Sequence, residues 1–516
     1  MEDRFENPRL LLGDRLRGIY RLLADVGGHV FGDDYFGDCY KRSRLGRPTV
    51  PARVLATVMV LQAHEGLSDG EACDRLERDL AWQAAAGVHC GYVAFHPTVL
   101  VGQRNRLRGS DRPRRLFEDT KVAAKESGWL GHRVRVLDST ALYDAVATQD
   151  TVTQLRSAIR TLLRVLDQHD RALAARVRAV LRRDDDYGGP GKPVCDWDDL
   201  EAKEALIDAL VRDALAALAV LDGETVSRSV REAAELLALV AGQDVEAGDD
   251  GVFRIAVRVA ADRVVSTVDP EARHGHKSHN RRFDGYKTHL SVDPDSELID
   301  EVVVTPANDH DATAVDELLA PVTGMETKPT VMGDSAYAGA ETLQRLAQAG
   351  FDDVKAKVPP ARGREGRFGK DDFEIDLTSG LVGCPAGRHA EIRYSDRGHG
   401  RADFAAHCVS CALRDRCTTS AWGRTVTIHP KEAVLQRAKA AQADPAWQDQ
   451  YRSTRPKVER KIAHFVAVVA GGRKARVRGR KRVATDADTR AAAVNWSRLA
   501  TLGIRFTDGK WVAATI

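Results

Sequence analysis

The sequence predicts an α/β protein in which an all-helical N-terminal domain precedes a mixed sheet that is interrupted by a helical insertion. Residues 1–130 carry helical patterns with clear start and stop signals and no strand pattern. After residue 130, short apolar runs bounded by turn residues alternate with helical patterns. This order favours a sheet with helices packed on its faces.

Three helices are predicted in the N-terminal domain. Residues 51–62 are strongly apolar, and a capping box at Ser68 begins a second helix that continues through Trp82. A third helix is expected to be capped by Thr98 and carries Arg104, Arg106 and Arg108. Short helices with a basic last member fit a DNA-binding helix-turn-helix, and they also fit a plain helical bundle.

The sheet is predicted from apolar runs and the turns between them. The first strand ends in Val-Leu-Asp138, and a turn of Asp and Pro at residues 293–296 joins the next two strands. The order of elements is then strand, strand, strand, helix, strand, helix, strand. After the first strand the expected elements are strands at 286–292, 298–305, 330–333 and 354–358, with helices at 311–319 and 339–350.

Two insertions interrupt this core. The first is almost entirely helical and is broken at residues 183–191, where an acidic triplet beside Gly and Pro indicates a solvated loop. The second contains four cysteines and is expected to be rich in loops, with little core of its own. The predicted parts are residues 1–130, 131–150, 151–250 (the helical insertion), 251–371, 372–430 (the cysteine insertion) and 431–516.

Three acidic residues stand out by their local context. Asp138 and Asp334 each close a short apolar run that reads as a strand, whereas Glu459 lies in a charged helical pattern. Two strand ends and a helix can bring carboxylates together on hard cations such as Mg²⁺ or Mn²⁺. Two such ions in one site suit phosphodiester cleavage. The three residues are therefore the predicted catalytic and metal-binding residues.

The order of these motifs resembles the DDE transposases of bacterial insertion sequences. The resemblance implies a ribonuclease-H-like core, binding of terminal inverted repeats, and DNA cleavage followed by strand transfer in the same site. It also implies a homo-oligomer on DNA, because two element ends must be joined. The segments that carry it are Leu-Asp138-Ser-Thr, Phe283-Asp-Gly-Tyr-Lys287-Thr-His, Thr305-Pro-Ala-Asn308-Asp-His310-Asp311, Gly333-Asp334-Ser-Ala-Tyr and Arg455-Pro-Lys-Val-Glu459.

The glutamate helix departs from the pattern of many relatives. That pattern is Y-x2-R-x3-E-x6-K, whereas here three residues separate Tyr451 from Arg455, and Val466 stands at the lysine position. Arg455 and Glu459 keep their spacing of one helical turn. Two other functions remain open: an inactive DNA-binding descendant of a transposase, and a stand-alone nuclease with the same core.

DNA would have to be held by local basic surface, because the net charge of the whole chain is only +2. Between residues 473 and 482, seven of ten residues are Lys or Arg and none is acidic. These side chains are expected to contact phosphates, while the N-terminal helices read the sequence. The predicted DNA-binding residues are Arg104, Lys287, Arg455, Lys461, Lys474, Arg476, Arg478 and Arg480.

The cysteines fall into two groups. Cys384, Cys408, Cys411 and Cys417 can form a tetrahedral site for structural Zn²⁺, although reduced cysteines can also pack without a metal. The remaining four are scattered singly and are expected to be buried, reduced and structural; they are Cys39, Cys73, Cys90 and Cys195.

Two histidine-containing segments give weaker signals. His274, His276 and His279 lie close together in the sequence without a carboxylate at ligand spacing, which favours a phosphate contact or a solvated loop over a metal site. Residues 308–311 are expected to support the active site. Because no signal peptide and no membrane span are apparent, the protein is expected to be cytoplasmic and associated with the nucleoid.

Overall fold

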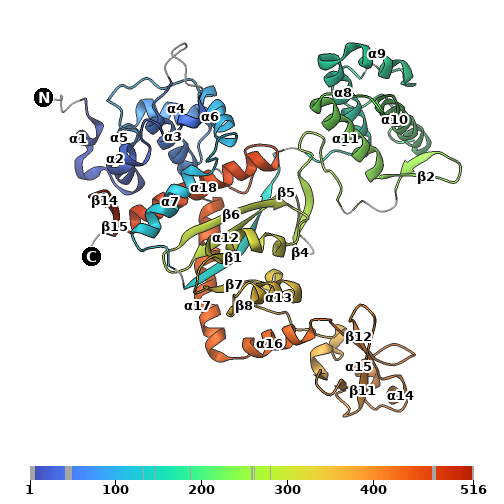
Figure 1. Cartoon of the computed structure of the whole chain (residues 1–516). Helices are drawn as coiled ribbons and strands as arrows, with labels where there is room; N and C mark the ends of the chain where they lie inside the picture. The colour runs from blue at the N-terminus through green and yellow to red at the C-terminus, as the bar shows by residue number, and fades with distance from the viewer. Residues whose placement is uncertain are drawn as a thin grey trace.

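The computed structural model describes residues 6–40, 49–131, 133–145, 147–185, 187–256, 260, 262–278, 281–467 and 472–513. Figure 1 shows a central body from which two insertions project. The central body contains the N-terminal helices, the main sheet and the C-terminal helices. The helical insertion and the cysteine insertion each have a separate hydrophobic core.

The N-terminal part is helical, as predicted, but two details differ. The helix that begins at the Ser68 capping box ends at Arg78, and the Asp79 side chain then caps a new helix. Pro97, not Thr98, precedes the next helix, and no side chain caps it. The helices are α1 (Pro8–Leu12), α2 (Gly18–Val30), α3 (Ala52–Glu65), α4 (Asp69–Arg78), α5 (Leu80–Ala86), α6 (Thr98–Arg108) and α7 (Arg115–Glu126).

The main sheet is mixed, which confirms the predicted α/β class. Its strand order is β4-β5-β1-β7-β8, and β6 pairs with β5. β1 is antiparallel to β5 and parallel to β7, and β7 is parallel to β8. The strands are β1 (Val134–Tyr143), β4 (Arg273–Ser278), β5 (Arg281–Asp293), β6 (Leu298–Pro306), β7 (Thr330–Gly333) and β8 (Val354–Ala356).

Alternate residues of β1 face opposite sides of the sheet. Val136 joins the core beneath the N-terminal helices, whereas Leu137 joins the core beneath α12 (Val315–Thr323) and α13 (Ala340–Gln348). Both residues are fully buried. The sheet is therefore covered on both faces.

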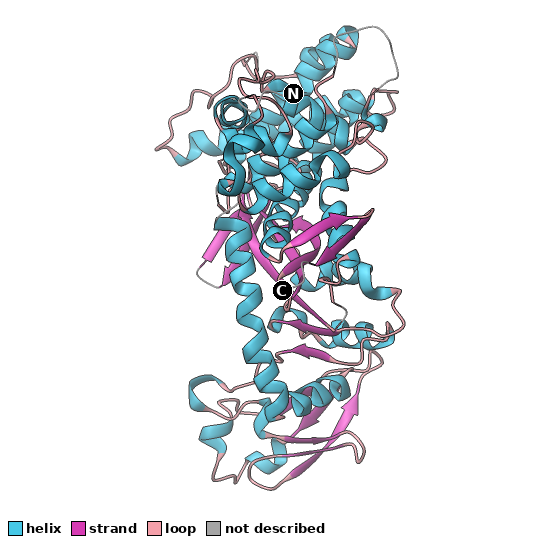
Figure 2. Cartoon of the chain, turned by 90° about the vertical axis from the view of Figure 1, so that its left-hand side faces the viewer, coloured by secondary structure: helices cyan, strands magenta, loops and turns pink. Residues whose placement is uncertain are grey.

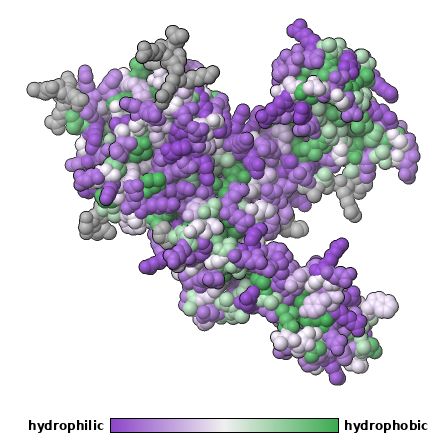
Figure 3. Space-filling model, viewed as in Figure 1, coloured by the Kyte–Doolittle hydropathy of each residue, from purple (hydrophilic) through white to green (hydrophobic). Residues whose placement is uncertain are grey.

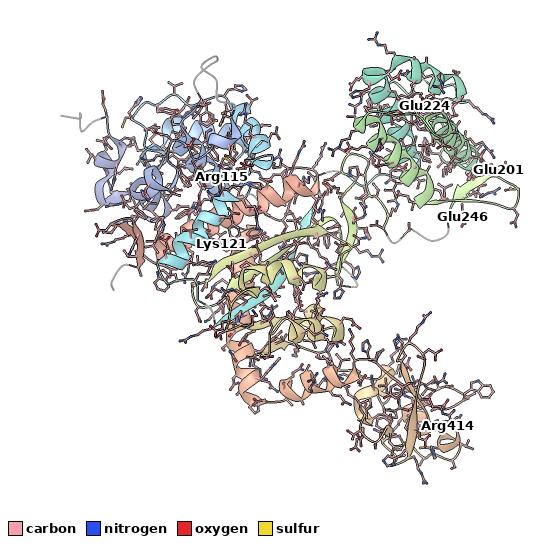
Figure 4. All side chains as sticks on the ribbon, viewed as in Figure 1. Arg115, Lys121, Glu201, Glu224, Glu246 and Arg414 are labelled. Atoms are coloured by element: carbon pink, nitrogen blue, oxygen red, sulfur yellow. The ribbon has the colours of Figure 1, made fainter. Side chains whose placement is uncertain are left out.

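The C-terminal part completes the central body. The long helix α17 (Pro445–Ala467) follows α16 (Glu432–Gln442) and runs along the sheet, as Figures 1 and 2 show. Helix α18 (Arg480–Thr501) packs against α3, α7 and β6 and is followed by the hairpin β14 (Ile504–Thr507) and β15 (Lys510–Ala513). In Figure 4, Arg115 and Lys121 mark α7 beside α18.

The described part of the helical insertion contains four helices around a core that includes Ile159, Leu162 and Leu210. A small hairpin at its end was not predicted. Its chain ends meet, because the Gln149 amide donates a 2.9 Å hydrogen bond to the Val265 carbonyl. The elements are α8 (Thr151–His169), α9 (Arg171–Val180), α10 (Leu200–Leu221), α11 (Arg228–Gln243), β2 (Val245–Ala247) and β3 (Phe253–Ile255).

The cysteine insertion differs from its prediction as a loop-rich segment with little core. It contains a five-stranded antiparallel sheet in the order β13-β12-β11-β10-β9, with a core that includes Phe373 and Phe404. The short strands alternate buried and exposed residues, so each contributes only a few side chains to this core. The elements are β9 (Glu374–Asp376), β10 (Leu381–Gly383), β11 (His389–Tyr394), β12 (Gly400–Asp403), β13 (Thr425–Ile428), α14 (Ala405–Cys408) and α15 (Arg414–Cys417).

The surface is largely hydrophilic on the face shown in Figure 3. Within the described residues, no helix combines the length and the apolar character that a membrane span requires.

Candidate active site

Asp138 and Asp334 lie at the same level of two adjacent strands. The parallel register of β1 and β7 pairs Val136 with Met332, and two further residues along each chain lead to Asp138 and Asp334. Parallel neighbours carry equivalent positions to the same edge of the sheet, which explains why strand-end carboxylates far apart in sequence meet here.

Local hydrogen bonds orient both carboxylates. Asp138 Oδ1 accepts a 2.7 Å hydrogen bond from the Ser139 amide. Asp334 Oδ1 accepts one of 2.9 Å from the Ala336 amide and so caps the short 3₁₀-helix at Ser335–Tyr337. In each case the second carboxylate oxygen is not used by this local bond.

Helix α17 is held across the ends of these two strands. The Tyr451 hydroxyl donates to the carbonyl of Gly333, directly before Asp334, at 3.1 Å. One turn later, Arg455 donates to the carbonyl of Leu137 at 3.1 Å and to Asp138 Oδ2 at 2.9 Å. The altered tyrosine spacing therefore places Tyr451 and Arg455 on one face of the helix.

Glu459 follows Arg455 by one turn on the same face. The two side chains approach to 3.9 Å, and the Glu459 side chain is 65% exposed. Burial would lower the pKa of Arg455, but the charges of Asp138, Asp334 and Glu459 raise it. Arg455 thus lies among all three predicted catalytic acids.

The donor set of three carboxylates suits a hard divalent cation. Among the described residues, no three His, Cys, Asp or Glu side chains form a group that could hold a metal ion. The Arg455 guanidinium occupies one oxygen of Asp138, where a cation would otherwise bind. Asp138, Asp334 and Glu459 could hold Mg²⁺ or Mn²⁺ once Arg455 shares or releases that oxygen.

A second ion pair lies beside the predicted triad. Lys287 Nζ donates to Asp311 Oδ1 at 2.8 Å and to the carbonyl of Asp309 at 2.7 Å. Asp311 Oδ2 accepts a 2.5 Å hydrogen bond from Ser139, the neighbour of Asp138. Burial would raise the pKa of Asp311, but Lys287 and Ser139 together hold it below its usual range.

His289 and Tyr337 are buried between these groups, and the sequence interpretation gave neither a role. His289 Nε2 lies 3.0 Å from the Thr305 hydroxyl, and burial lowers the pKa of His289 to about 4. Burial and the charges of Asp311, Asp138 and Asp334 raise the pKa of Tyr337 well above its usual value. Both residues lie in the sequence motifs that resemble the transposases. Their position in these motifs was the signal that could have identified them as residues of the site.

Several predicted DNA-binding residues take part in internal ion pairs. Lys287 pairs with Asp311, as described above, and Arg104 pairs with Asp69 at 2.5 Å. Lys461 lies on α17 with only 4% of its side chain exposed, 3.5 Å from Glu297. Burial lowers the pKa of Lys461. These positions favour structural roles for the three side chains.

The basic segment at 473–482 is anchored to the central body. Residues 473–475 run alongside the end of β1, where the Ala475 amide donates to the Tyr143 carbonyl at 2.7 Å. The Arg480 amide donates to Glu271 at 2.9 Å, and Arg476 donates to the Leu67 carbonyl. Lys474 and Arg478 are exposed. The segment thus lies along the surface between the sheet and the N-terminal helices.

The four cysteines of the cysteine insertion surround one small cavity of about 20 Å³. Cys408 and Cys417 are buried, and His407 also lines the cavity. Burial raises the pKa of Cys417, and the nearby thiols Cys408, Cys384 and Cys411 contribute in the same direction. Four thiols around one cavity match the ligand chemistry of a zinc site. Among the described residues, however, these cysteines do not form a group that is already arranged to hold a metal ion.

The scattered cysteines are free thiols, but their expected burial is wrong for three of them. Only Cys73 is buried, whereas Cys39, Cys90 and Cys195 are partly exposed. A small side chain in a short helix or loop can remain near the surface. The residue type cysteine was therefore not enough to predict the burial of these thiols.

The histidine segment lies at a large hollow of about 1040 Å³ between the helical insertion and the sheet. His274 and His276 line it, and His274 Nδ1 lies 2.7 Å from Asp284 Oδ1. The sequence interpretation did not foresee this carboxylate partner, which comes from the neighbouring strand. His279 and Asp186, of the acidic triplet, lie outside the described residues.

Two family models match separate parts of the chain. A model described as "Transposase domain (DUF772)" matches residues 10–106, which cover most of the N-terminal helices. A model described as "Transposase DDE domain" matches residues 383–500, which include most of the cysteine insertion, α16, α17 and most of α18. No curated protein and no solved structure matches the chain.

Proposed function

We propose, from the premise that this chain is a DDE-type transposase of an insertion sequence, that it binds terminal inverted repeats and cuts and rejoins DNA. The observation that carries this proposal is the meeting of Asp138 and Asp334 on adjacent strands beneath the helix that bears Glu459. The strand order and the two helices that follow β6 and β7 support a ribonuclease-H-like core.

The three carboxylates are proposed to hold two divalent ions, Mg²⁺ or Mn²⁺. When bound, such ions supply positive charge to the attacking and leaving oxygens of a phosphodiester. Asp138 is proposed to serve both ions. Arg455 holds the unloaded Asp138 in place and limits the repulsion among the three carboxylates.

The Lys287 and Asp311 pair is proposed to position Ser139 and, through it, the backbone at Asp138. Lys287 would then support the site rather than bind DNA directly. Lys474 and Arg478 remain the proposed phosphate contacts of the basic segment, together with Arg480. A homo-oligomer on DNA, an association with the nucleoid and a structural zinc ion in the cysteine insertion also belong to this proposal.

The test is cleavage and strand transfer on DNA that carries the flanking repeats of the element, with Mg²⁺ or Mn²⁺. The variants Asp138→Asn, Asp334→Asn and Glu459→Gln keep the size of each side chain and remove its charge. We expect all three to abolish nicking and joining without loss of DNA binding. Binding of Mn²⁺, measured by calorimetry, should weaken in the same variants.

The matched control is Glu341→Gln on α13, an exposed acid whose side chain is 65% exposed. This variant should keep both activities. Specific binding of the repeats without any chemistry would contradict the enzymatic proposal and favour an inactive DNA-binding descendant. Cleavage without joining would favour a nuclease, and activity that survives Glu459→Gln would exclude Glu459 from the site.

A further inference from the structure

A pocket of about 210 Å³ lies between the N-terminal helices and the start of α18. Its lining comes from segments far apart in the sequence, namely α3, α4, α6, the basic segment and α18. The charged residues that line it are Asp69, Arg104, Arg108, Arg476, Arg482 and Asp486.

Both carboxylates of this pocket are already paired. Asp69 pairs with Arg104 at 2.5 Å, and Asp486 pairs with Arg490 of its own helix at 2.8 Å. Within the part of the chain that the structure describes, no ion pair within 4.0 Å joins an acidic residue to the other three arginines of the lining. These are Arg108, Arg476 and Arg482.

The pKa values of two of these arginines are lowered by burial, with neighbouring positive charges as a further cause. Burial, followed by the charges of Arg482 and Arg104, lowers the pKa of Arg108. Burial also lowers the pKa of Arg476, despite the carboxylate of Asp486. Like charges held close together repel one another, and an anion placed among them would relieve this repulsion.

We propose that this pocket binds one phosphate group of the DNA backbone, with Arg108 and Arg482 as its principal donors. A guanidinium group presents paired N–H donors that match two phosphate oxygens. The inference rests on the proposed function, because DNA is the proposed source of the phosphate. A phosphate held here would link α6 of the N-terminal helices to α18.

The experiment compares the full chain with Arg108→Gln, Arg482→Gln and the double variant. Arg106→Gln is the matched control, because Arg106 lies on the same helix, is exposed and contacts the Tyr40 ring outside the pocket. One arm measures the shift in melting temperature caused by pyrophosphate. The other measures the affinity for repeat DNA as a function of salt concentration.

We expect pyrophosphate to raise the melting temperature of the wild type and of Arg106→Gln, but not of the double variant. On DNA, one lost phosphate contact should reduce the slope of log affinity against log salt by about one. An unchanged slope in the double variant would overturn the assignment to DNA, even if pyrophosphate binds. If the wild type bound no DNA, the proposed function would fail, while the pyrophosphate arm would still decide whether the pocket is an anion site.

Discussion

Arg455 is the residue on which the candidate active site depends most. Its side chain is 11% exposed and that of Asp138 is 13% exposed, so their ion pair is largely removed from water. An uncompensated charge is costly in such a place. The Asp138 carboxylate therefore requires positive charge nearby, which Arg455 supplies and which a divalent cation would also supply.

The first prediction follows from that requirement. Arg455→Gln should lower the free energy of unfolding by about 3 kcal/mol without metal, because the largely buried Asp138 carboxylate loses its ion pair with the Arg455 guanidinium. Mn²⁺ should then stabilise the variant more than it stabilises the wild type. Urea unfolding with and without Mn²⁺ measures both effects, and an equal response of the two proteins to Mn²⁺ would contradict the competition between Arg455 and the metal.

His289 gives a prediction about pH. Burial holds its pKa at about 4 in the folded protein, below the usual 6.5 of the unfolded chain. As the pH falls, His289 takes up a proton in the unfolded chain before it does so in the folded protein. The contribution of neutral His289 to the free energy of unfolding is therefore present above pH 6.5 and is lost as the pH falls toward 4. At about 1.4 kcal/mol per pKa unit, the loss is on the order of 3 kcal/mol.

The measurement is urea unfolding at several pH values between 7 and 4 for the wild type and His289→Gln. The glutamine can still bond to Thr305 but does not titrate in this range. The wild type should lose more stability than the variant as the pH falls. Parallel losses in both proteins would show that His289 does not carry this pH dependence.

At the scale of elements, the pairing of β5 with β1 depends on one glycine. Gly285 has φ +142°, and a Cβ added there would lie 2.3 Å from the Leu142 carbonyl oxygen. Gly285→Ala should therefore destabilise the protein by about 2 kcal/mol or more. Gly70→Ala is the control, because Gly70 lies in helix α4 with open space around it. Thermal unfolding of both variants tests this, and similar melting temperatures would contradict it.

The cysteine insertion gives the prediction about metal. Purified protein should contain about one Zn²⁺ per chain if the four converging thiols hold the ion, and a chelator should increase their reactivity. Cys411→Ser should lower the zinc content, whereas Cys90→Ser, outside the cavity, should not. Protein without zinc, whose thiols react equally before and after chelation, would instead indicate reduced cysteines that pack without a metal.

The elements were predictable where the local signal was strong. β1, β5 and β6 are long, β7 is apolar, and the Asp and Pro turn at residues 293–296 marks the boundary between β5 and β6. β4, in contrast, has no apolar pattern and was not predicted as a strand. The break at Asp79 was missed, because the helical pattern continues through it and only a side-chain cap separates α4 from α5. The strands of the cysteine insertion are too short, at three to six residues, to give a clear alternation.

At the scale of the whole molecule, the sequence indicated which residues are chemically important but not how distant segments pack. The meeting of Asp138 and Asp334 was expected from their strand ends, whereas the pairing of Arg104 with Asp69 requires the packing of α6 against α4. Helix α18 lies at the far end of the chain from α3, yet both contribute to one core. Such contacts depend on the tertiary fold, which local patterns do not encode.

The insertions, in contrast, should behave as independent folding units. The helical insertion has its own core, and its chain ends meet at Gln149 and Val265. If that core were lost, the insertion would become an unfolded loop whose two ends stay joined at Gln149 and Val265, and the main sheet would remain intact. Leu210→Asp places a charge in the fully buried interior of the insertion, so we expect the insertion to unfold while the central body remains folded.

Hydrogen exchange followed by mass spectrometry distinguishes the two parts. In Leu210→Asp, amides of α8, α10 and α11 should exchange rapidly, whereas those of β1 and β5 should stay protected. Leu290→Asp is the matched change in β5, where Leu290 is also fully buried, and it should expose the central body. Rapid exchange throughout the chain in Leu210→Asp would mean that the insertion and the sheet unfold as one cooperative unit. Unfolding of an independent insertion would leave the amides of the sheet protected.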